Sequence, residues 1–351
     1  MAALDIFDPD GVGQDNGAYF GLPFTPCEAR LVLISAPWDV TASYGGGTAD
    51  APGALVEAST QLDLYDELAP GAWRRGIATA DIDGSLRDLS RRLRPDAERV
   101  MRHLEKGGAV GDEAVARELR RVNEGCARMN GAICEQARSW LAQGKLVGLV
   151  GGDHSTPYGL IRALAERESG FGILHLDAHR DLRRAYEGFE FSHASIMYNV
   201  LRDVPQAERI VQVGVRDCCD AEAETARTSA RIRSFSDVQL FTAAFEGRTW
   251  GEQCRRIVDE LPRRVYVSFD IDCLSVEYCP HTGTPVAGGL SFNQALYLLY
   301  ETVRSGRRIV GFDVVETVVR PDNCIDASTA ARMLYRLCGL SIVSNDGTGN
   351  G

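Results

Sequence analysis

The stretch LHLDAHRDLR, residues 174–183, decides how the rest of the sequence is interpreted. Asp177, His179 and Asp181 occupy every second position in it and follow directly on the apolar run FGIL. Side chains of a strand alternate between its two faces, so these three would point the same way. At the end of a buried parallel strand this grouping is costly unless a group of opposite charge lies between the acids. The stretch therefore raises the expectation of a bound cation at a strand end.

Apolar runs alternate with helical patterns on both sides of this stretch. Short Val- and Ile-rich runs separated by helices are typical of a parallel sheet covered on both faces. We therefore predict a single-domain α/β fold, a three-layer α/β/α structure with a parallel sheet over residues 31–351, after an irregular arm at 1–30. Long charged helices are expected at about 85–143. The expected strands are 30–38, 74–83, 145–152, 171–179, 209–216, 263–272 and 307–316, and further helices are expected from Pro52 and at 158–168, 237–246 (helical or mixed), 292–306 and 327–344.

The composition limits the class of partner. A net charge of −11 argues against nucleic acid or an anionic membrane surface and fits a small cationic or neutral ligand. No apolar stretch is long enough to span a bilayer, and the first residues carry acids where a signal peptide carries Lys or Arg. None of the ten cysteines falls in a C-x-x-C pattern, which indicates free thiols. We expect a cytoplasmic protein without nucleic-acid or membrane partners.

Other polar clusters also follow expected strands. GGDHS, with His154, comes after VGLV; FDID, with Asp270 and Asp272, comes after VYVS; and Glu316 comes after IVGFDVV. In open α/β sheets, ligands bind beyond the carboxyl ends of the strands. Carboxylates and imidazoles together suit divalent transition ions, and four acids with two histidines exceed what one tetrahedral zinc needs. They fit two metal ions, a site that can generate hydroxide at neutral pH.

Each cluster also has a purely structural explanation. A lone D-x-D after a strand commonly caps the next helix or joins an ion pair. GGDHS could be a turn in which Asp153 or Ser155 caps a helix. Three such clusters at successive strand ends of one chain are hard to explain in this way, which favours the metal site.

In combination, these segments resemble the ureohydrolases, the family of arginase, agmatinase, guanidinobutyrase, formiminoglutamase and guanidine hydrolase. The similarity runs from PWDVTASYGGGTADAPG through GGDHS, DAHRD, SFDIDCL and TGTPVAGGL to DVVE. The resemblance implies a parallel sheet between helices, a homotrimer or homohexamer, and two divalent ions, Mn²⁺ or Ni²⁺. It also implies six metal ligands, with Asp177 and Asp270 bridging the ions: His154, Asp177, His179, Asp181, Asp270 and Asp272.

The resemblance implies roles for further residues. Asp181 is the candidate for passing a proton to the leaving amine, and Glu316 corresponds to the carboxylate that binds the guanidinium group. His193, in FSHASIM, corresponds to a histidine near the substrate and is a candidate proton shuttle. The alternative for His193 is a buried histidine with a structural role only.

Two departures from the family pattern bear on metal and substrate. The family usually continues D-x-D-x-x-D-P, whereas this chain has Ser275 and Val276, with Glu277 as a doubtful substitute for the missing acid. That acid lies behind the ligands, so metal affinity or geometry is expected to be tuned. Arg183 is expected to line the pocket and to discourage a second positive charge on the substrate. Alternatively, Glu187 or Glu190 neutralises it.

The leading hypothesis is therefore an enzyme that hydrolyses a small guanidino compound to urea and ammonia or an amine. The run AYEGF–SHASIMYN, with FGLPF, WDVT and CPHTGTPV, most resembles the guanidine-hydrolase branch, whose members are often labelled agmatinase, so guanidine is the favoured substrate. Agmatine is the next candidate and formiminoglutamate the third. The alternatives of other classes are a catalytically silent regulatory subunit and a one-metal zinc deacetylase.

Overall fold

A single parallel sheet forms the centre of the protein. The computed structural model describes residues 7–81, 84–320 and 322–346, and within them eight strands pair in the order β2-β1-β3-β8-β7-β4-β5-β6. Every neighbouring pair is parallel, as predicted from the alternation of apolar runs and helices. The strands are β1 (Leu31–Ala36), β2 (Ile77–Thr79), β3 (Leu146–Gly151), β4 (Phe171–Leu176), β5 (Ala207–Val213), β6 (Ile232–Phe235), β7 (Arg264–Asp270) and β8 (Arg308–Val315).

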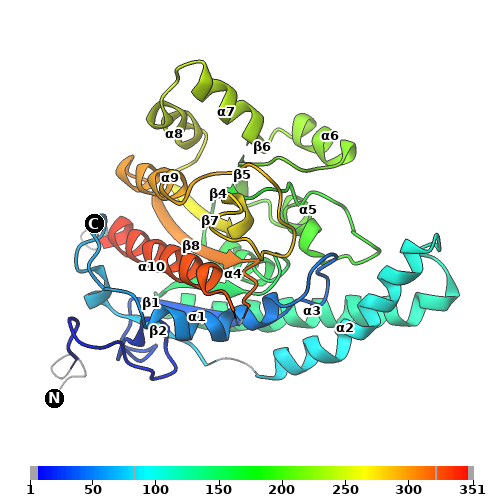
Figure 1. The fold of residues 1–351 in the computed structure, drawn as a ribbon, viewed down its shortest axis with the longest axis horizontal. Coiled ribbons are helices and arrows are strands. Elements are labelled where there is room, and N and C mark those ends of the chain that lie inside the picture. The colour runs from blue at the N-terminus through cyan, green and yellow to red at the C-terminus, as the bar shows by residue number, and fades with distance from the viewer. Residues whose placement is uncertain (1–6, 82–83, 321, 347–351) are drawn as a thin grey trace.

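Helices cover both faces of the sheet, so the prediction of three layers is confirmed (Figure 1). Strand side chains alternate between two apolar cores. Leu31 and Leu33 pack toward one helical layer, whereas Val32 and Ile34 pack toward the other. The first layer contains α1 (Ala51–Ser59), α7 (Asp237–Phe245), α8 (Trp250–Asp259), α9 (Phe292–Arg304) and α10 (Ile325–Asn345), and the second contains α2 (Gly84–Glu105), α3 (Glu113–Ala142), α4 (Tyr158–Arg167) and α5 (Ile196–Asp203).

Some short elements were not expected from the sequence. They are α5, α6 (Asp220–Thr228), β6 and α8. The edge strand β6 has only four residues, and three of them are partly or fully exposed, so it lacks the continuous apolar run of the central strands. Residues 82–83 of the expected strand at 74–83 lie outside the described residues, and β2 occupies 77–79.

Two segments extend the sheet domain. Tyr19 and Phe20 of the N-terminal segment are buried in the core, and the ring of Phe20 lies 5.0 Å from that of Tyr335 on α10. The helices α2 and α3 form an antiparallel hairpin that reaches beyond the sheet (Figure 1). Among the helices of the described residues, none is both long and apolar enough to cross a bilayer.

Candidate metal centre and substrate pocket

The predicted site residues come together at the carboxyl edge of the sheet. The four central strands β3, β8, β7 and β4 are neighbours, and they end next to His154, Glu316, Asp270 and Asp177 respectively. Because parallel strands place their carboxyl ends on one edge, residues more than 160 positions apart in the chain meet there. His154, for example, donates its backbone N–H to Glu316 Oε1 over 2.8 Å.

The first group of possible ligands surrounds the ring of His154. Its Nδ1 lies 3.0 Å from Asp177 Oδ2, 3.1 Å from Asp181 Oδ2 and 3.1 Å from Asp270 Oδ2. This buried nitrogen makes no hydrogen bond of acceptable geometry with any of the three oxygens. The other ring nitrogen, Nε2, lies 2.9 Å from Ser268 Oγ, which orients the ring. A nitrogen and three carboxylate oxygens converging in this way fit a divalent cation between them.

The second group shares Asp177 with the first. His179 Nδ1 lies 3.1 Å from Asp272 Oδ2 and 3.5 Å from Asp177 Oδ1. Asp177 therefore directs one carboxylate oxygen toward each group, as a bridging ligand does. The His/Asp cluster can hold metal ions at two adjacent positions.

Backbone amides fix the orientation of the carboxylates. Asp270 Oδ1 accepts a hydrogen bond from the Asp272 amide at 2.8 Å, and Asp272 Oδ1 accepts one from the Ala178 amide at 3.0 Å. The other oxygen of each side chain faces an imidazole. Since one oxygen is held by the backbone, the second is presented in a defined direction without loss of side-chain entropy on binding.

The buried carboxylates of the cluster repel one another, so positive charge between them is favourable. Burial raises the pKa of Asp270 well above its ordinary value, and the nearby carboxylates of Asp272 and Asp177 raise it further. Burial and Asp177 raise the pKa of Asp181 to about 6. Burial lowers the pKa of His154, but the three facing carboxylates outweigh it and raise that pKa well above 6.5. In the metal-free cluster, bound protons offset part of the negative charge of the aspartates. Divalent cations at the same place would offset more of it.

Two site residues adopt a left-handed backbone that non-glycine residues rarely take. Asp181 has φ 53° and Glu316 has φ 60°. The Asp181 carbonyl accepts hydrogen bonds from the amides of Met197 and Tyr198 at the start of α5, at 3.0 and 3.1 Å. The Glu316 carbonyl accepts one from Thr282 Oγ1 at 2.9 Å. Strain of this kind costs about 1–3 kcal/mol and is typical of functional sites.

His193 lies at the opening of the cluster. Its Nδ1 is 3.7 Å from Glu316 Oε1, and its Nε2 is 3.2 Å from Ser43 Oγ. Burial, with the positive charges of His179 and His154 nearby, lowers the pKa of His193 to about 3. The imidazole is therefore neutral at physiological pH.

A cavity of about 440 Å³ leads from His179, Asp181 and His193 to the surface. Arg183 lines it, as predicted, but its charge partner is Glu222 rather than Glu187 or Glu190: the distance from Arg183 Nε to Glu222 Oε2 is 3.5 Å. The guanidinium also stacks 4.7 Å from the ring centre of Tyr186. The remaining wall residues are Ser43, Tyr44, Ala194, Asp217, Cys218, Thr284, Pro285 and Val286.

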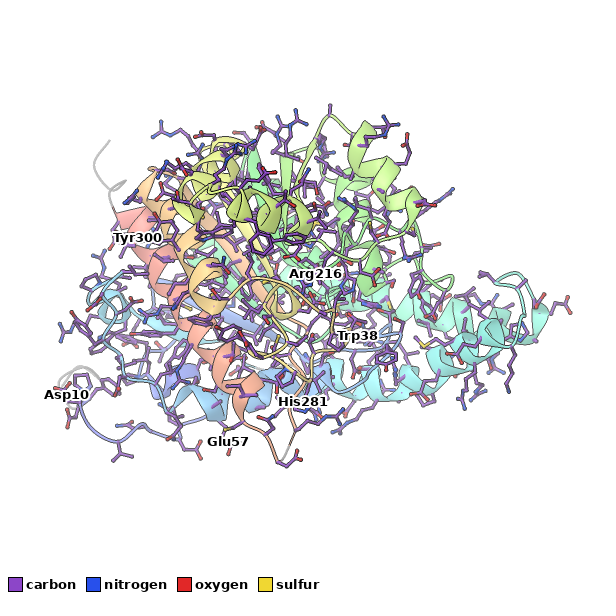
Figure 2. All side chains as sticks on the ribbon, turned by 45° about the horizontal axis from the view of Figure 1, so that its top comes forward. Asp10, Trp38, Glu57, Arg216, His281 and Tyr300 are labelled. Carbon is purple, nitrogen blue, oxygen red and sulfur yellow. The ribbon has the colours of Figure 1, made fainter. Side chains whose placement is uncertain are left out.

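The acids that the sequence offered as alternatives have other roles or none at the metal cluster. Glu277 is exposed and therefore does not replace the missing acid behind the ligands. Asp153 accepts hydrogen bonds from Thr41 and Ser155, and α4 begins at Tyr158 without a side-chain cap, so neither Asp153 nor Ser155 caps it. Arg216, labelled near the middle of Figure 2, donates to the carbonyl of Asp272 at 2.6 Å and to that of Val286 at 3.0 Å. It thereby joins the metal-site loop to the cavity wall.

Sequence reasoning missed several contributors. His175 Nε2 lies 2.7 Å from Asp177 Oδ2, and the side chain of Gln212 lies 3.2 Å from the other ring nitrogen. His175 was noted as one of the histidines near the polar clusters but was given no role, although it shares the two-residue alternation of Asp177. Thr41, which accepts a hydrogen bond from the His193 amide, carried no signal in the sequence.

The chain is similar to hydrolases of known name over nearly its whole length. A model of the Arginase family matches residues 29–339. The N(1)-aminopropylagmatine ureohydrolase of Thermus thermophilus is 32% identical over 328 residues, which cover 92% of this chain and 94% of that protein. The agmatinase of Cronobacter sakazakii is 29% identical over 317 residues, covering 88% of this chain and 87% of that protein.

A solved structure shares the fold. The proclavaminate amidino hydrolase of Streptomyces clavuligerus superimposes with a TM-score of 0.69 at 22% identity, covering 96% of this chain and 100% of that one. The two proteins therefore share one fold, a parallel sheet between helical layers.

Proposed function

Because this chain belongs to the arginase family and is a ureohydrolase, we propose that its substrate is a guanidinoalkylamine of the agmatine type. The reaction would add water to the guanidinium carbon and break one C–N bond, giving urea and a protonated amine. The observation that carries the proposal is the convergence of His154 Nδ1 with three carboxylates, one of which, that of Asp181, lines a 440 Å³ cavity. The two similar proteins compared above, named for agmatine and its aminopropyl derivative, support the substrate class.

We propose that the cluster holds two divalent ions, Mn²⁺ or Ni²⁺. His154, Asp177, Asp181 and Asp270 would hold one, and Asp177, Asp270, His179 and Asp272 the other. The donor set fits, since a buried imidazole nitrogen that makes no hydrogen bond of acceptable geometry faces three carboxylates. Such a metal pair, when bound, lowers the pKa of a water molecule enough to supply a nucleophile near neutral pH.

The chain's own residues handle the substrate and its protons. The Glu316 carboxylate would bind the guanidinium group by charge-assisted hydrogen bonds, with its position set by the His154 amide. Asp181 would accept a proton from the attacking water and pass it toward the leaving amine. His193, whose Nδ1 lies 3.7 Å from Glu316 Oε1, would relay that proton at the cavity side.

The cavity favours a substrate with an amine tail over free guanidine. Free guanidine would fill only a small part of 440 Å³. The charge of Arg183 is opposed by Glu222, and Asp217 adds a second carboxylate to the same wall. The wall is therefore not closed to a second positive charge. Guanidine, favoured on sequence grounds, stays the second candidate because Arg183 still presents a guanidinium to the cavity.

Urea release tests the proposal. The full chain, reconstituted separately with Mn²⁺ and Ni²⁺, is offered agmatine, N(1)-aminopropylagmatine, guanidine, arginine and 4-guanidinobutyrate, and formiminoglutamate with formamide as the product measured. We expect kcat/KM to be highest for one of the two amines. Turnover of guanidine alone would replace the proposed substrate by the second candidate. Two bound metal ions per chain without any turnover would contradict the assignment as an active enzyme.

A further inference from the structure

The hairpin of α2 and α3 reaches the candidate active site through one arginine. We infer that Arg94, on α2, is a positioning residue that holds His193 in its working place through the loop at residues 39–43. The inference rests on the proposed role of His193. It also gives a function to the helical segment at about 85–143, whose purpose the sequence did not reveal.

Arg94 binds the loop at several points. Its Nη1 donates to the carbonyl oxygens of Asp39 at 3.0 Å, Val40 at 3.2 Å and Ala42 at 2.6 Å. Its Nε donates to Glu98 Oε1 at 3.2 Å, which orients the guanidinium from the next turn of the helix. Nη1 carries only two N–H groups, so at least one of them is shared between two carbonyl oxygens, while the planar guanidinium lets Nε bind Glu98 at the same time.

A second residue of α2 holds the same loop. Ser90 Oγ lies 3.3 Å from both the amide nitrogen and Oδ1 of Asp39. Asp39 Oδ2 accepts a hydrogen bond from the Gly47 amide at 2.8 Å, which closes the loop. Trp38, directly before the loop, is fully buried and lies between the centre of the domain and the hairpin (Figure 2). Helix α2 and the loop therefore form one packed unit.

The loop in turn determines where His193 lies. Thr41 Oγ1 accepts a hydrogen bond from the His193 amide at 3.2 Å and donates one to Asp153 Oδ2 at 3.0 Å. Ser43 Oγ lies 3.2 Å from His193 Nε2. Both the backbone and the ring of His193 are thus held by residues between or next to the carbonyls that Arg94 binds.

Removing the guanidinium frees three carbonyl groups while leaving the metal cluster untouched. The hydrogen bonds of Arg94 go to Asp39, Val40, Ala42 and Glu98, and none of them involves a candidate metal ligand. A looser loop would let the His193 ring drift from Glu316 Oε1, now 3.7 Å away. A displacement of about 1 Å in a catalytic group can cost on the order of 100-fold in rate. The effect should therefore appear in kcat rather than in metal binding.

The test is a double-mutant cycle in the metal-loaded full chain. Arg94→Met keeps the length of the stem, and Arg92→Met, at an exposed position on the same helix, is the matched control. We expect R94M to lower kcat about 10- to 100-fold, with KM changed less than threefold and two metal ions still bound. R94K should recover part of the loss, and R92M should match the wild type. In a His193→Ala background, adding R94M should change kcat by less than twofold.

A spectroscopic measurement separates this inference from the proposed function. The ring resonances of His193, assigned in the wild type with the H193A variant, should shift in R94M and stay unchanged in R92M, whichever substrate the enzyme uses. An equal loss of kcat in the wild-type and H193A backgrounds, or unchanged His193 resonances in R94M, would overturn the inference. Loss of metal or of thermal stability in R94M as the sole effect would show that Arg94 only supports the fold.

Discussion

The floor and the mouth of the cavity are built differently. By the floor we mean the buried cluster of His154, Asp177, Asp270 and Asp272 at the ends of central strands, which His179 and Asp181 connect to the cavity. Backbone amides set the orientation of Asp270 and Asp272, and Ser268 that of His154. The mouth consists mainly of side chains on loops, with Glu222 from the first turn of α6, and Tyr44 there is 84% exposed. A rigid floor holds the reacting groups in a fixed geometry, whereas loop residues can change without disturbing the sheet. We infer that the floor determines the reaction and the mouth the choice of substrate.

The largest effect is expected from breaking the floor. Asp270→Asn keeps the size of the side chain but removes a negative charge that faces His154 Nδ1 at 3.1 Å. We expect metal content to fall below two ions per chain and urea release to drop at least about 1,000-fold, because nucleophile generation depends on the metal. Asp217→Asn, at the exposed mouth, should keep both ions. Full activity of D270N would contradict the division into floor and mouth.

A smaller loss is expected where floor and mouth meet. His193→Ala removes the proposed proton relay next to Glu316, and general acid–base groups contribute about 100- to 10,000-fold. We expect kcat to fall by about 100-fold while metal content stays at the wild-type value. Metal analysis and steady-state kinetics of the same preparation check this. A variant that keeps its kcat would assign His193 the purely structural role considered above.

The charge of the floor should also appear in stability. In the metal-free protein the pKa of His179 is raised to about 12 and that of His154 lies well above 6.5, since the facing aspartates outweigh the effect of burial. The unfolded chain loses these protons as the pH rises through about 6.5, whereas the folded protein keeps them. We therefore expect the free energy of unfolding of the metal-free protein to fall between pH 6.5 and 8, by an amount on the order of 1–2 kcal/mol.

Urea denaturation at several pH values measures this dependence. Protein saturated with metal provides the control, because cations replace the bound protons and should remove or reverse the decline. A metal-free protein that becomes more stable over the same range would mean that the histidines are not paired with the acids as described.

The smallest effect is expected at the mouth. Arg183→Met removes a positive charge and leaves Glu222 and Asp217 facing the cavity. We expect KM for agmatine to fall about three- to tenfold, with kcat for guanidine changed less than twofold. Arg184→Met, at the exposed neighbouring position, is the matched control. A larger change in kcat than in KM would mean that Arg183 takes part in the reaction itself and not only in the choice of substrate.

Local pattern alone was enough to predict the sheet and the ligand candidates. A buried parallel strand must be apolar along its length, and a polar side chain can follow only at its end, so Asp177 and Asp270 mark both the strand and the site. Short or edge elements such as β6 lack this pattern and were missed. Arg183 was expected at the cavity and lies there, and its charge partner is Glu222 rather than either of the alternatives considered, Glu187 and Glu190.

Sequence by itself therefore determined the parallel α/β architecture and which residues gather at the strand ends, because both follow from periods of two and 3.6 residues. Only the tertiary structure decided the contacts between distant segments. The pairing of Arg183 with Glu222 and the support of the 39–43 loop by Arg94 join segments 39 and about 50 residues apart. No local periodicity specifies such contacts, since they depend on how loops and helices pack once the sheet has formed.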